Sequence, residues 1–278
     1  MTWLEAAFRW THVVAGILWI GHLYFFNFVN LQVAKAYDPE SRKKVVPELM
    51  PRALYWFRWG AVWTWTSGFL IAGLVYWSVD NLIRKDEAGR PTMSHVGGVA
   101  IALVLIGVVF FVYEGVWKAL GKNERVATGV LFALLVALLV ALQQVFTGRA
   151  LFVHAGMLFG TIMVMNVWMR IWPAQKKLIS AAKGVAAAPD PAVAPMAALR
   201  SKHNTYLSVP LVFTMVSNHY PTIYGWEHSW IVLSGIVALG FLVAKLLYLK
   251  SAGPAPARFG VRAPLPPPGT PGMAAPKA

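Results

Sequence analysis

The sequence predicts an all-α fold: an integral membrane bundle of about seven transmembrane helices. Of its 278 residues, 58% are hydrophobic and only 13% are charged. Apolar runs recur from one end of the chain to the other, and many are long enough to cross a hydrocarbon core of ~30 Å. This composition is typical of a membrane domain. We therefore expect one helical transmembrane domain over residues 1–250.

Cysteine content and charge exclude several classes of function. The chain has no cysteine, which excludes disulfides, thiolate metal sites and covalently attached haem c in this chain. The net charge of +14 would suit nucleic acid. The basic residues, however, lie between the apolar runs, as they do in the cytoplasmic loops of membrane proteins. We expect the lipid bilayer as a partner and no nucleic acid.

Seven apolar segments are the expected spans. They cover residues 7–32, 54–78, 95–118, 126–147, 151–172, 203–220 and 229–249. Most basic residues lie on one side if the amino terminus is outside and the carboxyl terminus inside. No basic leader precedes the first span, so we expect it to stay in the mature protein. Segment 173–202 should be a long inner loop, and the Pro/Gly/Ala-rich segment 251–278 a disordered tail.

The first two spans have faces suited to close helix packing. At ~100° per residue, His12, Gly16 and Trp19 share one face of the first span. The second span carries a stripe of small residues, namely Gly60, Thr64, Gly68 and Ala72. A histidine in a span either bonds to a neighbouring helix or serves function, and ligation of haem is the obvious function.

The third and fourth spans each carry polar groups that need partners. Glu114 is the only acidic residue within a predicted span, so we expect it to pair with Arg58 or Arg125 or to relay protons. The fourth span is apolar until Gln143 and Gln144 near its outer end.

The fifth span is expected to have one packing face and one free face. Gly156 and Gly160 form a GxxxG pair that favours close contact with another helix. His154 and Thr161 lie roughly opposite that pair. We therefore expect the face with His154 to be free to meet a ligand.

The sixth span has polar clusters at both ends. His203 and Asn204 lie at the inner end, and Asn218 and His219 lie at the outer end. Pro210 in its middle cannot donate a backbone hydrogen bond, so we expect a kink there.

Sorting residues by depth gathers most polar side chains of the outer half into one layer. This outer layer comprises His12, Gln143, Gln144, Arg149, His154, Asn218 and His219. Neutral imidazoles from facing helices are the usual ligands of a b-type haem. Two of His12, His154 and His219 are therefore candidate ligands for such a haem.

Four blocks of the sequence point to a known family. Residues 12–26, 54–68, 148–168 and 200–221 resemble the membrane domain of the cytochrome-linked urate oxidases, also called membrane urate hydroxylases. The resemblance implies a bacterial inner-membrane protein that oxidises urate to 5-hydroxyisourate. Full-length relatives pass electrons to a c-type cytochrome fused after an eighth span. Since this chain has no CxxCH motif, the resemblance implies a separate c-type cytochrome as electron acceptor.

Two positions depart from the pattern of this family. Gly60 and Asn30 stand where the resemblance leads us to expect acidic residues. If those carboxylates handle substrate or protons, this chain has lost the activity or changed its substrate.

The leading hypothesis is an oxidoreductase acting on a purine-like anion. A planar anion rich in hydrogen-bonding groups calls for an arginine and amides. The candidate catalytic residues are His12, His154, Asn218 and His219, and the candidate substrate-binding residues are Arg149, Gln143, Gln144, Asn218, His203 and Asn204. One alternative is a haem-b electron-transfer or anchor subunit without urate activity. The other is a small-molecule transporter, which Pro210 and the polar sixth span suggest.

Overall fold

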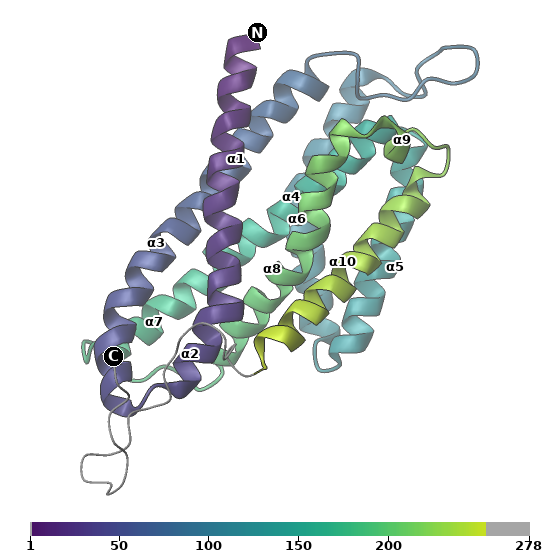
Figure 1. The fold of residues 1–278 in the computed structure, drawn as a ribbon. Helices are drawn as coiled ribbons and strands as arrows, with labels where there is room; N and C mark the ends of the chain where they lie inside the picture. The colour runs from purple at the N-terminus through teal and green to yellow at the C-terminus, as the bar shows by residue number, and fades with distance from the viewer. Residues whose placement is uncertain (1, 254–278) are drawn as a thin grey trace, which may run out of the picture.

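The computed structural model describes residues 2–253, and this part of the chain is helical with no β-strand (Figure 1). The predicted all-α fold is confirmed. The elements in chain order are α1 (Thr2–Tyr24), η1 (Phe25–Asn30), α2 (Leu31–Ala36), α3 (Pro39–Ala72), η2 (Gly73–Trp77), α4 (His95–Leu120), α5 (Glu124–Gln143), α6 (Gly148–Asn166), η3 (Val167–Ile171), α7 (Trp172–Ala182), α8 (Val193–Val216), η4 (Ser217–His219), α9 (Pro221–Tyr224) and α10 (Ser229–Ser251). Of the predicted tail over 251–278, residues 254–278 lie outside the described residues, and Ser251 is the last residue of α10.

Within the described residues, 5 helical segments are long and apolar enough to cross a membrane, which is compatible with a multi-pass membrane protein. They are Trp3–Ala36, His95–Leu120, Glu124–Gln143, Gly148–Ala182 and Ser229–Ser251. The predicted spans within α3 and α8 are helical but more polar, and they do not meet the same criterion. The count of seven spans therefore stays a prediction.

The expected loop over 173–202 is wrong. The helix that begins as α6 continues through η3 and α7 to Ala182, and α8 begins at Val193. Only residues 183–192 connect them. Alanine is the strongest helix former, so an alanine-rich segment extends a helix unless proline or glycine interrupts it. In α7, Ala174 and Ile179 are buried, and this packing anchors the extension.

The helices form a bundle in which α6 and α8 occupy the middle (Figure 1). Helices α1 and α3 pack along one side of this pair, and α5 and α10 lie on the other side. Nearly every residue of α6 from Ala150 to Asn166 is buried. Helix α6 is therefore the core of the molecule.

Small residues let the helices approach closely where the sequence predicts it. A Cβ atom at Gly60 of α3 would lie 3.1 Å from the Trp19 nitrogen and 3.3 Å from the Ala15 oxygen of α1. A Cβ atom at Gly156 of α6 would collide with Thr214 of α8. Both predicted packing faces are thus confirmed.

Three π-helical segments interrupt the long helices within residues 2–253. A π turn holds an extra residue, which changes the direction of the side chains around it, and such turns are frequent at functional sites. They carry Asn27 in η1, Tyr76 in η2 and Arg170 in η3. Each of these side chains makes hydrogen bonds to another helix.

Candidate functional site

A cavity of about 380 Å³ lies between α1, α3, α6 and α8, near the end of the bundle where α6 begins. Its polar lining residues are Arg9, His12, Tyr76, Arg149, Asn218 and His219. Its other walls are largely apolar and include Trp65, Phe69, Val153, Met157 and Leu211. Two arginines and no acidic residue are found among the described residues that line it. Such a cavity favours an anionic ligand with an apolar or aromatic body.

His12 is held in one orientation by helix α3. Its Nδ1 lies 2.8 Å from the Thr64 carbonyl oxygen, which can only accept a hydrogen bond, so Nδ1 carries the proton. This leaves Nε2 with a lone pair. A Cβ atom at Gly68 would lie 2.8 Å from His12 Cε1, so the imidazole occupies space that only glycine leaves open. The site therefore presents a fixed imidazole that can accept a proton or ligate a metal.

Arg149 is held by two residues from other helices. The Asn218 Oδ1 atom accepts hydrogen bonds from Arg149 Nε at 3.0 Å and from the Tyr76 hydroxyl at 3.0 Å. The Arg149 guanidinium carbon also lies 5.8 Å from the centre of the Tyr76 ring. Because Nε is engaged, the two terminal nitrogens remain for a ligand. A guanidinium fixed in this way suits bidentate binding of a planar oxyanion.

Local structure brings these groups to the cavity. Arg149 lies in the first turn of α6, where the Thr147 side chain caps the helix by accepting from the Ala150 nitrogen at 3.2 Å. The positive end of a helix dipole adds to the attraction of this region for anions. Tyr76 is turned toward Asn218 by the π-helical segment η2.

His154 does not line this cavity, so the prediction that its face of α6 is free to meet a ligand is wrong. It is buried, and its Nδ1 donates to the Ala150 carbonyl at 2.7 Å, while its Nε2 accepts from the Trp77 indole at 3.1 Å. Both ring nitrogens therefore have protein partners. In this arrangement His154 orders the first turns of α6 against η2.

The two glutamines of the outer layer also lie outside the cavity. Gln143 is buried, and its Oε1 accepts from the Trp230 backbone nitrogen at 3.2 Å. Gln144 is exposed. Of the predicted outer layer, the structure thus brings together His12, Arg149, Asn218 and His219.

Of the three predicted haem ligands, His12 and His219 line this cavity and His154 does not. His12 keeps a free Nε2, and His219 lines the same cavity. His154 has no free nitrogen in this arrangement. Among the described residues, no group of three or more His, Cys, Asp or Glu residues is placed to hold a metal ion, so any haem iron here would rest on two imidazoles.

His203 and Asn204 lie in a separate network at the opposite end of α8. His203 Nδ1 is 2.6 Å from the Tyr113 hydroxyl, which accepts from Asn166 Nδ2 at 3.2 Å. Asn204 accepts from Asn166 at 2.9 Å and donates to the Met163 carbonyl at 2.9 Å. These bonds link α4, α6 and α8. Neither His203 nor Asn204 lines the cavity near the start of α6, which we call the outer cavity after the predicted outer layer.

The predicted partners of Glu114 are wrong. Glu114 accepts hydrogen bonds from Arg170 at 2.7 Å and from Arg200 at 3.0 Å, whereas Arg58 and Arg125 make no ion pair with it in the described structure. The π-helical segment η3 and the early start of α8 cause the difference. From the sequence alone, Arg170 lies at the end of a span and Arg200 in a loop. In the structure both lie on helical segments, and both reach Glu114 of α4.

Sequence reasoning missed two residues of the cavity. Arg9 lies three positions before His12, so it shares a helix face with it, and that spacing was a usable signal. Tyr76 gave no such signal, because its direction depends on the π-helical segment η2.

One comparison with known proteins identifies a family for this chain. The family model described as Urate oxidase N-terminal matches two overlapping segments, residues 1–44 and 36–263. No curated protein and no solved structure matches the chain. The match includes every helix that forms the cavity. The chain therefore belongs to the urate oxidase N-terminal family.

Proposed function

We propose that this protein is an integral membrane oxidoreductase that oxidises urate to 5-hydroxyisourate in the outer cavity. The observation that carries the proposal is a cavity with a fixed arginine, a fixed imidazole with a free Nε2, and no acidic lining residue among those described. Urate is a planar anion, and the match to the urate oxidase N-terminal family supports it as the substrate.

Each polar residue has a role in this proposal. The terminal nitrogens of Arg149 bind the anionic edge of urate, and Asn218 holds the guanidinium in place. His12 Nε2 accepts a proton as water adds to the ring, and the Thr64 carbonyl stabilises the imidazolium that forms. The aromatic rings of Trp65 and Phe69 line the wall on which the purine stacks.

The oxidation needs an electron acceptor. Urate and one water yield 5-hydroxyisourate, two electrons and two protons, so two one-electron acceptors balance each turnover. We propose a separate c-type cytochrome in this role. A b-type haem held by His12 and His219 would occupy the same His12 Nε2 that accepts the proton, so it belongs to the second candidate function below. With the amino terminus outside, the cavity would face the periplasmic side of a bacterial inner membrane, where such a cytochrome is found.

Reduction of cytochrome c that depends on urate tests the proposal in purified protein. His12→Ala should lower turnover by ~100-fold or more, because a general base contributes about that much. Asn218→Ala should raise KM ~10-fold, because Arg149 loses its orientation. His22→Gln, on the same helix but outside the cavity, should retain activity. The proposal fails if the unmodified protein, with its cofactor content measured, shows no reaction with urate.

A haem-b subunit without urate activity is the second candidate. The placement of His12 and His219 on one cavity favours it. This candidate predicts a reduced-minus-oxidised haem spectrum and no turnover of urate. His12→Ala and His219→Ala should each abolish the haem spectrum, whereas His154→Ala should leave it unchanged. Turnover of urate in the same preparation would decide against it.

A further inference from the structure

The polar residues that line the outer cavity differ in their exposure. Arg9 of α1 and His219 of η4 are exposed, whereas His12, Arg149 and Asn218 are half-buried. The cavity therefore has a rim, which includes Arg9 and His219, and an interior that holds the other three residues. Of the two rim residues, only Arg9 carries a charge at every physiological pH. The proposed function gives Arg9 no role.

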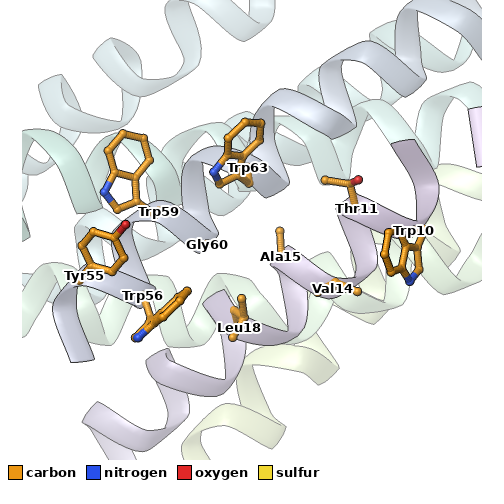
Figure 2. Close-up of a pocket in the computed structure, with 10 residues that line it drawn as sticks. All are labelled: Trp10, Thr11, Val14, Ala15, Leu18, Tyr55, Trp56, Trp59, Gly60 and Trp63. Atoms are coloured by element: carbon orange, nitrogen blue, oxygen red, sulfur yellow. The ribbon is translucent and has the colours of Figure 1, made fainter. Parts of the chain in front are cut away.

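Helix α1 presents different faces to two hollows of the molecule. Trp10, Val14 and Leu18 line a groove between α1 and α3 (Figure 2). By the helical period, Arg9 lies ~100° from Trp10 around the helix axis but only ~60° from His12. Like His12, Arg9 lines the outer cavity and not the groove. The rotation of α1 about its axis thus turns the Arg9 side chain toward the outer cavity.

A carboxylate one helical turn away holds Arg9 at the rim. Glu5 Oε1 accepts hydrogen bonds from Arg9 Nε at 2.9 Å and from Arg9 Nη2 at 2.7 Å. Among the described residues, Arg9 Nη1 has no acceptor, so it is left for a ligand. The side chains of Arg9 and Glu5 are 47% and 35% exposed. An exposed ion pair at this spacing is weak, so it leaves the guanidinium able to engage a second anion.

We propose that Arg9 attracts anionic ligands to the outer cavity and so selects them by charge. This inference rests on the proposed function, in which the ligand is the urate anion. From the rim, the charge of Arg9 attracts an anion that approaches the cavity, and Nη1 donates a hydrogen bond to it. Arg149 binds the same anion in the interior. A neutral planar molecule of the same shape gains no such attraction from Arg9.

The exposure of Arg9 makes its contribution to affinity depend on salt. The distance over which exposed charges interact falls from ~10 Å at ~0.1 M salt to ~3 Å at ~1 M. The attraction between Arg9 and an anion should therefore fade over this range. Contacts of the half-buried Arg149 are screened less and should persist. Salt dependence thus separates the role of Arg9 from that of Arg149.

The test is equilibrium binding of radiolabelled urate to the purified protein, without an electron acceptor, in ~0.1 M and ~1 M NaCl. Arg9→Gln should weaken binding about 5-fold in low salt and less than about 2-fold in high salt, because it removes an exposed charge. Arg9→Lys keeps the charge and should retain most of the affinity. Glu5→Gln keeps an acceptor for Arg9 and removes the opposing charge, so binding in low salt should strengthen about 2-fold.

The ion pair between Arg52 and Glu48 of α3 provides matched controls. It has the same i, i+4 spacing, with the two charged groups 2.6 Å apart, and neither residue lines the outer cavity. Arg52→Gln and Glu48→Gln should leave the affinity for urate unchanged at both salt concentrations. Thermal unfolding of each variant confirms that it folds.

Three results would overturn the role of Arg9: equal affinity of Arg9→Gln and the unmodified protein in low salt, an equal loss at both salt concentrations, or weaker binding by Glu5→Gln. Urate-dependent reduction of an electron acceptor is measured separately. Protein that binds urate in this charge-dependent way but does not oxidise it refutes only the proposed function. Protein that oxidises urate with no dependence on Arg9 refutes only the role of Arg9, and the absence of saturable urate binding refutes both.

Discussion

Two residues of α3 determine how His12 faces the cavity. The Thr64 carbonyl fixes the proton on Nδ1, and Gly68 leaves the space that the imidazole ring fills. Neither residue needs to touch a substrate. Thr64 and Gly68 affect the proposed reaction by orienting the His12 imidazole, so they are positioning residues.

Gly68→Ala tests this dependence. The added methyl group would lie 2.8 Å from His12 Cε1, so the ring must move. Because small displacements of a catalytic group are costly, we expect urate turnover to fall between about 10- and 100-fold. Steady-state kinetics alongside thermal unfolding measures both effects.

Gly107→Ala is the matched control. Gly107 lies in α4, and a Cβ atom there would meet nothing within 4 Å. Activity should be unchanged, and the helix should gain up to ~1 kcal/mol. Equal activity in the Gly68 and Gly107 variants would show that His12 tolerates displacement or plays no part in turnover.

At the scale of helices, the π-helical segments decide which polar side chains meet. The segment η3 directs Arg170 toward Glu114, and η2 directs Tyr76 toward Asn218. A regular helix of the same sequence would turn these side chains elsewhere. The ion pairs of Glu114 in turn tie α4 to η3 and α8 at the end of the bundle opposite the cavity.

Glu114→Gln should destabilise the protein by about 2 kcal/mol. Removing the carboxylate charge leaves two arginines together, and the Arg200 side chain is only 9% exposed. The value is below the usual ~3–5 kcal/mol for a buried pair because the Arg170 side chain is 39% exposed. Chemical unfolding of the purified protein in detergent measures the change.

Glu124→Gln provides the comparison. Glu124 pairs with Lys202 at 3.1 Å, but both side chains are about half exposed. Its loss should cost less than ~0.5 kcal/mol. If the two variants unfold at the same denaturant concentration, the Glu114 cluster contributes no special stability.

At the scale of the whole molecule, orientation and the number of spans can be tested together. The chain contains no cysteine, so single introduced cysteines report their own exposure to a membrane-impermeant maleimide. We expect Glu87→Cys to label from outside in intact cells, and Ser41→Cys and Asn123→Cys to label only after lysis.

This pattern would also show that α3 crosses the membrane, because residues 41 and 87 flank its apolar part. Labelling of both positions from the same side would remove α3 from the spans. Labelling with the reverse sidedness would place the outer cavity on the cytoplasmic side and exclude a periplasmic cytochrome as its direct partner.

The bounds of several helices followed directly from the sequence. The predictions for 95–118 and 229–249 agree closely with α4 and α10, because long apolar runs end at charged or turn-forming residues. The seams of small residues were also predictable, since i, i+4 spacing alone places them on one face. The helices over residues 173–202 could not be predicted in the same way, because an alanine-rich composition fits either a helix or a linker.

The sequence by itself determined that this is an apolar helical protein with a small-residue seam between two of its helices and polar groups gathered toward the helix ends. Those properties depend on composition and on the period of a single helix. Only the tertiary structure decided that His12, Arg149, Asn218 and His219 share a cavity while His154 and Gln143 are taken up by neighbouring groups. That outcome depends on the rotation of each helix about its axis, which packing and the three π-helical segments determine.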